Sequence, residues 1–440
     1  MSSGPFSAVA GMRIGADLPR WLPIRRTGSL PEEADPAGAA SHALDPLCAR
    51  LQPGTRVAVA VGSRGVANLS AVVQAVVARL VEAGAEPYVV PAMGSHGGGT
   101  ADGQRQVLAD LGVSEETVGV PVRATMDTVV VGRTPDGFEV HLDAEAAAAD
   151  GILVVNRVKA HTDFRSETPE GTFGSGLAKM SVIGLGNHAG ASRVHAYGSA
   201  SLPRHIRAAA TVLREAGHLL GGVALIENAA DRTARVAAVD ADGIGGPAEA
   251  DLLDDARSRA GALPVDTLDV LVVDMMGKDI SGSGMDTNTL GRIWVPGVEE
   301  PDRPQVTAVT VHDLTPTSHG NAAGIGLADL VPFRVIDKID LHATYLNSIT
   351  SGTGGLRRGR LPMVLATDAD VVCAAVRMSG QPDPGQLRLA RVRSTRHLDT
   401  LMVSEALCAD GPPPGYEVRG PAAPVAFTPE GDLPPWPDLG

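Results

Sequence analysis

Aromatic and basic residues are both scarce in this chain of 440 residues. Aromatic side chains make up only 3%, so the stacking platforms that hold single-stranded nucleic acids are not expected. Acidic residues outnumber lysine and arginine by 51 to 37, which gives a formal net charge of −14. Because phosphate backbones attract basic surfaces, this balance also argues against a nucleic-acid partner.

Cysteines and long apolar runs are few as well. The three cysteines, Cys48, Cys373 and Cys408, are far apart and form no CxxC pair, so neither a disulfide framework nor a thiolate zinc site is expected. No apolar run reaches the ~18 residues that a spanning helix needs, so we expect no membrane partner. The first 21 residues lack the basic start and apolar stretch of a signal peptide, and a cytoplasmic location is predicted.

The chain is rich in alternating strand and helix patterns. Apolar spacing predicts a helix over 69–85, and Thr100 is placed to cap a second helix over 100–113. A central turn signal predicts a hairpin over 127–142. The strand–loop–helix alternation favours parallel βαβ units and hence an α/β fold. Predicted strands that run into loops lie within 55–63, 86–99, 149–161 and 267–286.

The length predicts more than one domain. We expect two α/β domains with largely parallel sheets, an N-terminal catalytic, cofactor-binding domain over 1–265 and a C-terminal domain over 266–440. Proline and glycine dominate from about residue 409, so the tail is expected to lack regular structure. Ligands of α/β folds bind beyond the carboxyl ends of the strands. The active site is expected there, in the cleft between the two domains.

Loops after the predicted strands carry three polar side chains, Arg64 in VGSRG, His96 in AMGSHGGGT and His161 in VKAHTDF. Two histidines from separate strand ends could face each other, one removing a proton and the other returning it. The planar guanidinium of Arg64 could clamp a carboxylate or a phosphate. Ordinary alternatives are hydrogen-bonded loop histidines and a surface ion pair.

Lys179 lies among glycines and small residues in GSGLAKMSVIG. Loss of solvation favours a neutral, nucleophilic amine, which suits a Schiff base or another covalent bond to a cofactor. The alternative is a lysine that extends along a helix to solvent. His188 and His195 follow, and one of them could ligate a metal whose other ligands come from elsewhere.

A glycine loop of the second domain, GKDISGSGMDTNTLGR (277–292), is the last candidate. Residues of this loop could reach across an interdomain cleft, although the same composition suits a solvated turn. Its polar residues include Lys278, Asp279, Asp286, Asn288 and Arg292.

Taken in order, VGSRG, AMGSHGGGT, VKAHTDF, GSGLAK and NHAGASRVH resemble the motifs of the nickel-dependent lactate racemase family. The resemblance covers roughly 10–265 and extends more weakly to KDISGSGMD. It implies a nickel-pincer nucleotide, a pyridinium ring whose two sulfur-bearing arms hold nickel and which is tethered to a lysine. The implied activity is racemisation or epimerisation of a 2-hydroxy acid by reversible hydride transfer. Enzymes that make the cofactor are the implied partners.

The resemblance also implies a role for each motif residue. Lys179 resembles the tethering lysine, and His195 resembles the nickel ligand, with His188 as the competitor. His96 and His161 resemble the two acid–base histidines. In this interpretation the glycines around Lys179 leave room for a large nucleotide.

Two further residues are implied for substrate binding. Arg64 matches the arginine near the substrate carboxylate, and Lys278 corresponds loosely to polar residues of the C-terminal domain. The chain departs from the family at Val61, where an acidic residue is usual. A longer segment before Lys179 carries Arg165 and Glu167, which suggests a larger or more polar substrate than lactate.

Two alternative functions keep the same residues. The protein could be another lysine-dependent enzyme of hydroxy or keto acids, such as a Schiff-base former or a one-way redox enzyme. It could also be a carrier that binds a cofactor or metal without turnover.

Overall fold

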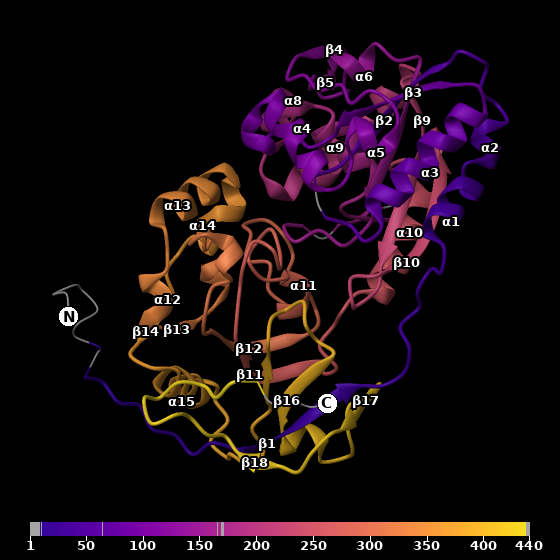
Figure 1. The fold of residues 1–440 in the computed structure, drawn as a ribbon. Helices are drawn as coiled ribbons and strands as arrows, with labels where there is room; N and C mark the ends of the chain where they lie inside the picture. The colour runs from indigo at the N-terminus through magenta and orange to yellow at the C-terminus, as the bar shows by residue number, and fades with distance from the viewer. Residues whose placement is uncertain (1–8, 10, 64, 165, 169–170, 437–440) are drawn as a thin grey trace. The chain divides into compact units, whose positions relative to one another are not determined.

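The computed structural model describes residues 9, 11–63, 65–164, 166–168 and 171–436. The chain forms two compact units, and each is described by itself (Figure 1). The N-terminal unit is Leu30–Ala260, and the C-terminal unit combines Met1–Ser29 with Gly261–Gly440. Both units contain sheets that are mainly parallel and helices, so the predicted α/β class is confirmed.

The N-terminal unit is built on a five-stranded sheet in the order β10-β9-β6-β2-β3. All neighbours are parallel except the edge strand β10. The run Val57–Val61 is completely buried, as expected for a parallel strand covered on both faces. The strands are β2 (Arg56–Val61), β3 (Glu86–Pro91), β6 (Gly151–Arg157), β9 (Leu219–Glu227) and β10 (Thr233–Asp240).

The helices of this unit follow the sequence prediction closely. In α3 (Leu69–Glu82) the buried residues recur every three or four positions, and Thr100 accepts the N–H of Gly103 as the cap of α4 (Ala101–Asp110). The predicted hairpin is present as β4 (Thr128–Arg133) and β5 (Glu139–Asp143). Other helices of this unit are α1 (Pro36–Ala43), α2 (Asp45–Cys48), α5 (Glu115–Val118), α6 (Ala144–Ala147), α9 (Leu202–Glu215) and α10 (Pro247–Arg259), and α7 and α8 are described with the site.

The C-terminal unit contains the longer sheet, in the order β14-β13-β12-β11-β15-β16-β1-β17. The pairs from β14 to β15 are parallel, and those from β15 to β17 are antiparallel. Its parallel strands are β11 (Thr267–Val273), β12 (Gln305–Val311), β13 (Leu330–Pro332), β14 (Met363–Leu365) and β15 (Leu389–Val392). Its helices are α11 (Thr287–Leu290), α12 (Phe333–Asp337), α13 (Leu341–Thr350), α14 (Gly355–Arg358) and α15 (Asp368–Met378).

The predicted division at residue 265 put the first 29 residues in the N-terminal domain, but the structure groups them differently. They group with the C-terminal unit because β1 (Arg20–Arg26) pairs with β16 (Thr400–Ser404) (Figure 1). The tail also differs from the expectation, because β17 (Tyr416–Val418) and β18 (Ala423–Pro424) both pair with β1. An unpaired edge exposes backbone donors and acceptors, so the tail strands satisfy groups of β1.

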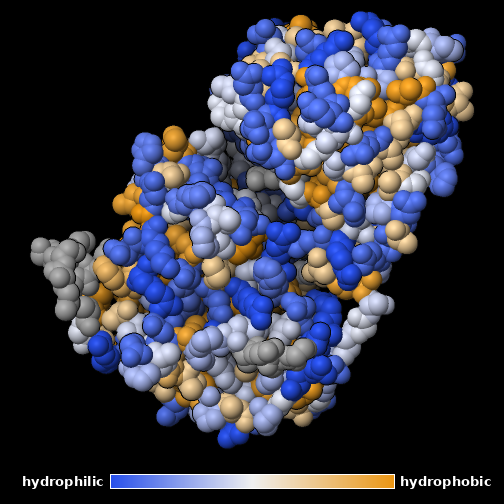
Figure 2. Space-filling model, viewed as in Figure 1, coloured by the Kyte–Doolittle hydropathy of each residue, from blue (hydrophilic) through white to orange (hydrophobic). Residues whose placement is uncertain are grey.

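Exposed apolar side chains gather on α13 and α14, where Figure 2 shows orange surface. Only Thr344 and Ser348 of α13 are buried, so this helix turns its apolar residues outward. The exposed set is Leu341, Tyr345, Leu346, Ile349 and Leu356.

The structure can be compared with two expectations from the sequence, those on disulfides and on membrane-spanning helices. All three cysteines are free thiols, as predicted. Among the helices of the described residues, none combines the length and the apolar character needed to cross a bilayer.

Candidate active site

Three neighbouring parallel strands bring candidate residues to one edge of the N-terminal sheet. Ser63 follows β2, His96 follows β3 and His161 follows β6, and β2 lies between the other two strands. Strands in a sheet are about 4.8 Å apart, so the ends of β3 and β6 are separated by roughly 10 Å. Arg64, the predicted carboxylate clamp, lies outside the described residues.

His96 is exposed and is held by the neighbouring loop. Its Nδ1 forms a hydrogen bond with Oγ of Ser63, which joins the loops after β2 and β3. Gly97 has φ +66°, and a Cβ there would lie 2.5 Å from the backbone nitrogen of Gln104. The glycine therefore allows the loop to pass directly against the start of α4.

His161 and Lys179 come together through a backbone pairing. After β6 the chain forms a small hairpin, β7 (Ser166–Thr168) and β8 (Gly171–Phe173), and returns so that Lys159 and Ser175 exchange two hydrogen bonds of 2.9 Å. The short helix α7 (Leu177–Lys179) follows at once. As a result, Nζ of Lys179 lies 2.9 Å from Nε2 of His161.

The hydrogen bonds of His161 indicate the tautomer of its ring. The backbone N–H of Asp163 donates to Nδ1 at 3.0 Å, so Nδ1 carries the lone pair. A neutral imidazole with this tautomer has its proton on Nε2, from which it can donate to a lone pair of the Lys179 amine. The 2.9 Å contact is one that an unprotonated, nucleophilic amine at Lys179 can make. Phe164, which is 1% exposed, stacks on the imidazole at 4.1 Å and fixes the ring plane.

His195 is positioned by an irregular helical segment that begins at Lys179. On a regular α-helix, residues 16 apart would point about 160° away from each other. A π-helical turn over Met180–Gly184, closed by the Leu185 N–H to the Met180 carbonyl at 2.9 Å, precedes α8 (Asn187–His195) and changes this phase. His195 ends within electrostatic range of both Lys179 and Asp163.

The ring of His195 has the tautomer of a metal ligand. Nδ1 donates to the carbonyl of Ala191 at 2.7 Å, which leaves the lone pair on Nε2. Desolvation lowers the pKa of His195, the bond to Ala191 raises it, and the charges of Lys179 and Asp163 act in opposite directions on it. The residue nonetheless keeps an exposed edge.

His188, the competing candidate, lies in the first turn of α8 in a different environment. Its Nδ1 is 3.0 Å from Oγ of Ser95, and its Nε2 is 3.4 Å from Oγ of Ser192. Each ring nitrogen therefore has a serine partner, and the side chain joins α8 to the loop that carries His96.

Glycines around Lys179 do not leave open space, contrary to the sequence interpretation. A Cβ on Gly184 would lie 2.7 Å from the Ala92 carbonyl oxygen, and one on Gly186 would lie 2.4 Å from the Val182 carbonyl oxygen. A Cβ on Gly176 would meet Oε1 of Glu249 at 2.2 Å. These glycines allow neighbouring backbone and side chains to pack closely.

The glycine loop of the C-terminal unit is more structural than its composition suggests. Arg292 is 6% exposed, pairs with Asp329 at 2.7 Å and donates to backbone carbonyls of β12, while Asp286 caps α11. Lys278 is half-buried, and its Nζ bonds Oδ1 of Asn347 in α13 at 2.7 Å. Of this loop, Lys278 remains a candidate for substrate binding.

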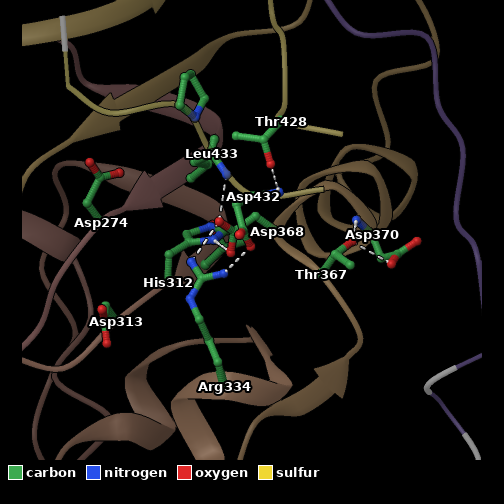
Figure 3. A network of polar contacts seen from close by, with 12 residues as sticks. Asp274, His312, Asp313, Arg334, Thr367, Asp368, Asp370, Thr428, Asp432 and Leu433 are labelled. Carbon is green, nitrogen blue, oxygen red and sulfur yellow. Dashed lines mark hydrogen bonds and ion pairs between the residues drawn. The ribbon is translucent and has the colours of Figure 1, made fainter. Parts of the chain in front are cut away.

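A buried polar cluster around His312, which sequence analysis missed, lies in the C-terminal unit (Figure 3). Nδ1 of His312 is 2.7 Å from Oδ1 of Asp368, and Nε2 is 2.9 Å from Oγ1 of Thr310. This resembles a hydroxyl–histidine–carboxylate relay, but Thr310 and Asp368 are fully buried and His312 is 2% exposed. A substrate cannot reach the hydroxyl, so the relay is structural.

The remaining bonds of Asp368 attach the tail to this cluster. Arg334 bridges Asp368 and Asp432 with two contacts of 2.7 Å, and the N–H of Leu433 donates to Asp368 at 2.7 Å (Figure 3). The signal that could have identified Asp368 is its place in the first turn of α15, directly after the capping Thr367.

The geometry of the N-terminal unit defines a class of protein. It is an α/β protein in which a lysine amine contacts a histidine at the carboxyl edge of a parallel sheet, an arrangement that suits covalent attachment and proton transfer. Residues 22–195 match the model of the lactate racemase N-terminal domain. This segment is therefore similar to the N-terminal domain of the lactate racemase family. The matched segment contains every predicted site residue except Lys278.

Similarity to known proteins beyond this domain is low. Among curated proteins, none matches the sequence. The lactate racemase apoprotein from Thermoanaerobacterium thermosaccharolyticum has 10% identity over 78% of this chain and 93% of its own, with a TM-score of 0.45. A crystal structure of a protein from Thermotoga maritima has 14% identity over 83% of this chain and 99% of its own, with a TM-score of 0.48. The likeness to the lactate racemase family therefore rests on the match over residues 22–195.

Proposed function

We propose that this protein is a cytoplasmic racemase or epimerase of 2-hydroxy acids that carries a nickel-pincer nucleotide on Lys179. The match of residues 22–195 to the lactate racemase N-terminal domain supports a racemase-type function. The observation that carries the residue assignment is the 2.9 Å contact between Nζ of Lys179 and Nε2 of His161.

The residues present fit this cofactor. A neutral amine at Lys179 can be acylated, and His195 offers Nε2 to a metal. Within the described residues, no group of three or more His, Cys, Asp or Glu is arranged to hold a metal ion. A single histidine makes a weak site, so most ligands of the metal must come from the organic group. When bound, the cofactor supplies reversible hydride transfer at the carbinol carbon.

The acid–base work falls to the two histidines. His96 and His161 follow strands on either side of β2, so each can serve one face of a substrate at the end of that strand. The imidazole that faces the hydroxyl accepts its proton as the carbinol is oxidised and returns it when the alcohol re-forms. Once Lys179 is an amide it no longer has a basic lone pair to accept the Nε2 proton of His161, and the ring can act as a base when that proton has moved away and left the lone pair on Nε2.

Substrate binding is assigned to Arg64 and Lys278. Arg64 directly follows Ser63 at the end of β2, where a carboxylate would lie between the two histidines. Lys278 would add a positive charge from the C-terminal unit. The physiological partners would be a 2-hydroxy acid and the enzymes that make the cofactor, with neither nucleic acid nor membrane.

The experiment is intact-mass analysis after co-expression with the cofactor-making enzymes. We expect a mass increment that peptide analysis places on Lys179 and that Lys179→Arg removes. The loaded protein should then racemise members of a panel of chiral 2-hydroxy acids. An unmodified Lys179, under conditions that load a known lactate racemase, would contradict the proposal.

A second candidate is favoured by the same amine. An unprotonated lysine can attack a keto acid, expelling water to form an imine. Borohydride reduction in the presence of keto acids would fix such an imine on Lys179. Trapping without any nickel-dependent racemisation would favour a Schiff-base enzyme. A protein that loads the cofactor and turns over no hydroxy acid would be a carrier.

A further inference from the structure

Glu249 is a buried acidic residue that neither the motifs nor the proposed chemistry uses. It lies in the first turn of α10, 70 residues from Lys179 in sequence, and is 8% exposed. Its carboxylate accepts the N–H of Gly245 at 2.8 Å and that of Ala178 at 3.2 Å from each oxygen. The N–H of Leu177 also interacts with it.

These bonds lie at the start of the helical segment that carries the reactive lysine. Ala178 is the residue before Lys179, and the first N–H groups of a helix lack partners within the helix. Glu249 supplies acceptors for two of them from a distant part of the chain. Burial raises the pKa of Glu249, while the N–H groups and the positive charge of Arg207 lower it.

Packing at Gly176 supports the same conclusion. A Cβ at this position would lie 2.2 Å from Oε1 of Glu249, so the carboxylate rests directly on the backbone that precedes α7. The side chain of Asn156 donates to the Gly176 carbonyl at 3.4 Å from the other side. The turn before Lys179 is therefore held between β6 and α10.

We propose that Glu249 is a positioning residue that sets the turn at Gly176–Ala178 and thereby keeps Nζ of Lys179 against His161. The inference rests on the proposed role of Lys179 as the attachment point, but not on the identity of what is attached. A carboxylate suits this position because one side chain with two oxygens serves several N–H donors at once.

The test measures the reactivity of the Lys179 amine in the full chain purified without cofactor-making enzymes. The sequence has only four lysines, Lys159, Lys179, Lys278 and Lys338, so peptide mass spectrometry can follow each one. Acetylation by an N-hydroxysuccinimide ester is timed at pH 7.5, and the rate at Lys179 is divided by that at Lys338. In the native chain Lys179 should react faster, because Lys338 is paired with Asp313.

Glu249→Gln keeps the shape but places an amide donor against N–H donors. We expect the Lys179/Lys338 ratio to fall roughly tenfold, since a displacement of ~1 Å can cost up to about 10²-fold in reactivity. Asp255→Asn is the matched control, because it removes another carboxylate from α10, one that pairs with Arg235 and Arg259 and should leave the ratio unchanged. An unchanged ratio in Glu249→Gln would overturn the proposal, and so would an equal fall in rate at all four lysines.

A second pair of variants decides the question even if Glu249→Gln does not fold. Gly176→Ala should lower the ratio because its methyl group displaces the carboxylate. Glu249→Asp withdraws the oxygens by about 1.5 Å, one C–C bond, so Gly176→Ala should cost less in that background. If the two substitutions lowered the Lys179/Lys338 ratio by independent, additive amounts, the proposal would be overturned. A failure to load nickel would count against the proposed function alone, because this readout needs no cofactor.

Discussion

His161 and His312 occupy comparable places in the two units, and each ring nitrogen of both has a hydrogen-bond partner. Each histidine follows a parallel strand, β6 for His161 and β12 for His312. His161 bonds a backbone N–H and the amine of Lys179, whereas His312 bonds a carboxylate and a hydroxyl inside a closed core. The difference shows that the hydrogen-bond partner and the exposure of a histidine after a strand decide whether it is a candidate catalytic residue.

The comparison is tested most strongly by His161→Gln. General acid–base catalysis typically contributes about 10²–10⁴-fold, so racemisation by the loaded enzyme should fall by that factor. The free energy of unfolding should change by less than about 1 kcal/mol, because the half-buried ring can be replaced by another polar group. His42→Gln, in exposed α1, serves as the control for both measurements. A loss of stability as large as that in His312→Gln would erase the proposed distinction.

His312→Gln should show the opposite pattern. It disturbs two buried partners, Asp368 and Thr310, at about 1–3 kcal/mol for each group left unsatisfied. We therefore expect a loss of about 3 kcal/mol in denaturant unfolding, followed by tryptophan fluorescence. All three tryptophans, Trp21, Trp294 and Trp436, belong to the C-terminal unit, so the signal reports on that unit. His342→Gln, exposed on α13, should unfold like the native chain; equal stability of the two variants would refute a structural role for His312.

Acid should affect the two units in opposite directions through two buried carboxyls. Burial raises the pKa of Asp143 to about 6, although hydrogen bonds from Ala146 and Asn187 lower it. Its stabilising contribution to the free energy of unfolding is therefore complete below about pH 4, and about 3 kcal/mol of it is lost as the pH rises through 6. Burial also acts to raise the pKa of Asp368, but bonds from His312 and Arg334 hold it at about 2. Its contribution of about 2 kcal/mol is complete above pH 4 and is lost as pH falls toward 2.

These pH profiles are measured by hydrogen exchange in β2 and β6 for Asp143 and by tryptophan fluorescence for Asp368. Asp143→Asn and Asp368→Asn should each flatten the profile of its own unit only. Profiles that slope in the same direction in both units would show that these two carboxyls do not dominate.

Much of the N-terminal site could be predicted from sequence because its parts are local. Continuous apolar runs identify β2, β3 and β6, and the loops after them carry Ser63, His96 and His161. The small residues around Lys179 predicted an unusual lysine, and its Nζ lies 2.9 Å from Nε2 of His161. The reason given for the glycines was wrong, since sequence cannot tell space for a ligand from space for another backbone.

Features that depend on distant contacts could not be predicted. The approach of His161 to Lys179 results from backbone pairing between Lys159 and Ser175, to which side-chain patterns are indifferent. The π-helical turn after Lys179 has no residue signature. Glu249 looks like any acidic residue in a first helical turn, and only the fold reveals what it bonds.

The pairing of β1 with β16 has a consequence for how the protein is made. Trp21 is paired with Ser404, so β1 leaves the ribosome long before its partner exists. At ~5–20 residues per second the strand waits roughly 20–80 s, while all of Leu30–Ala260 is synthesised and free to fold. The lysine-bearing unit can thus mature as a contiguous piece, and the C-terminal sheet closes last, around a segment that was made first.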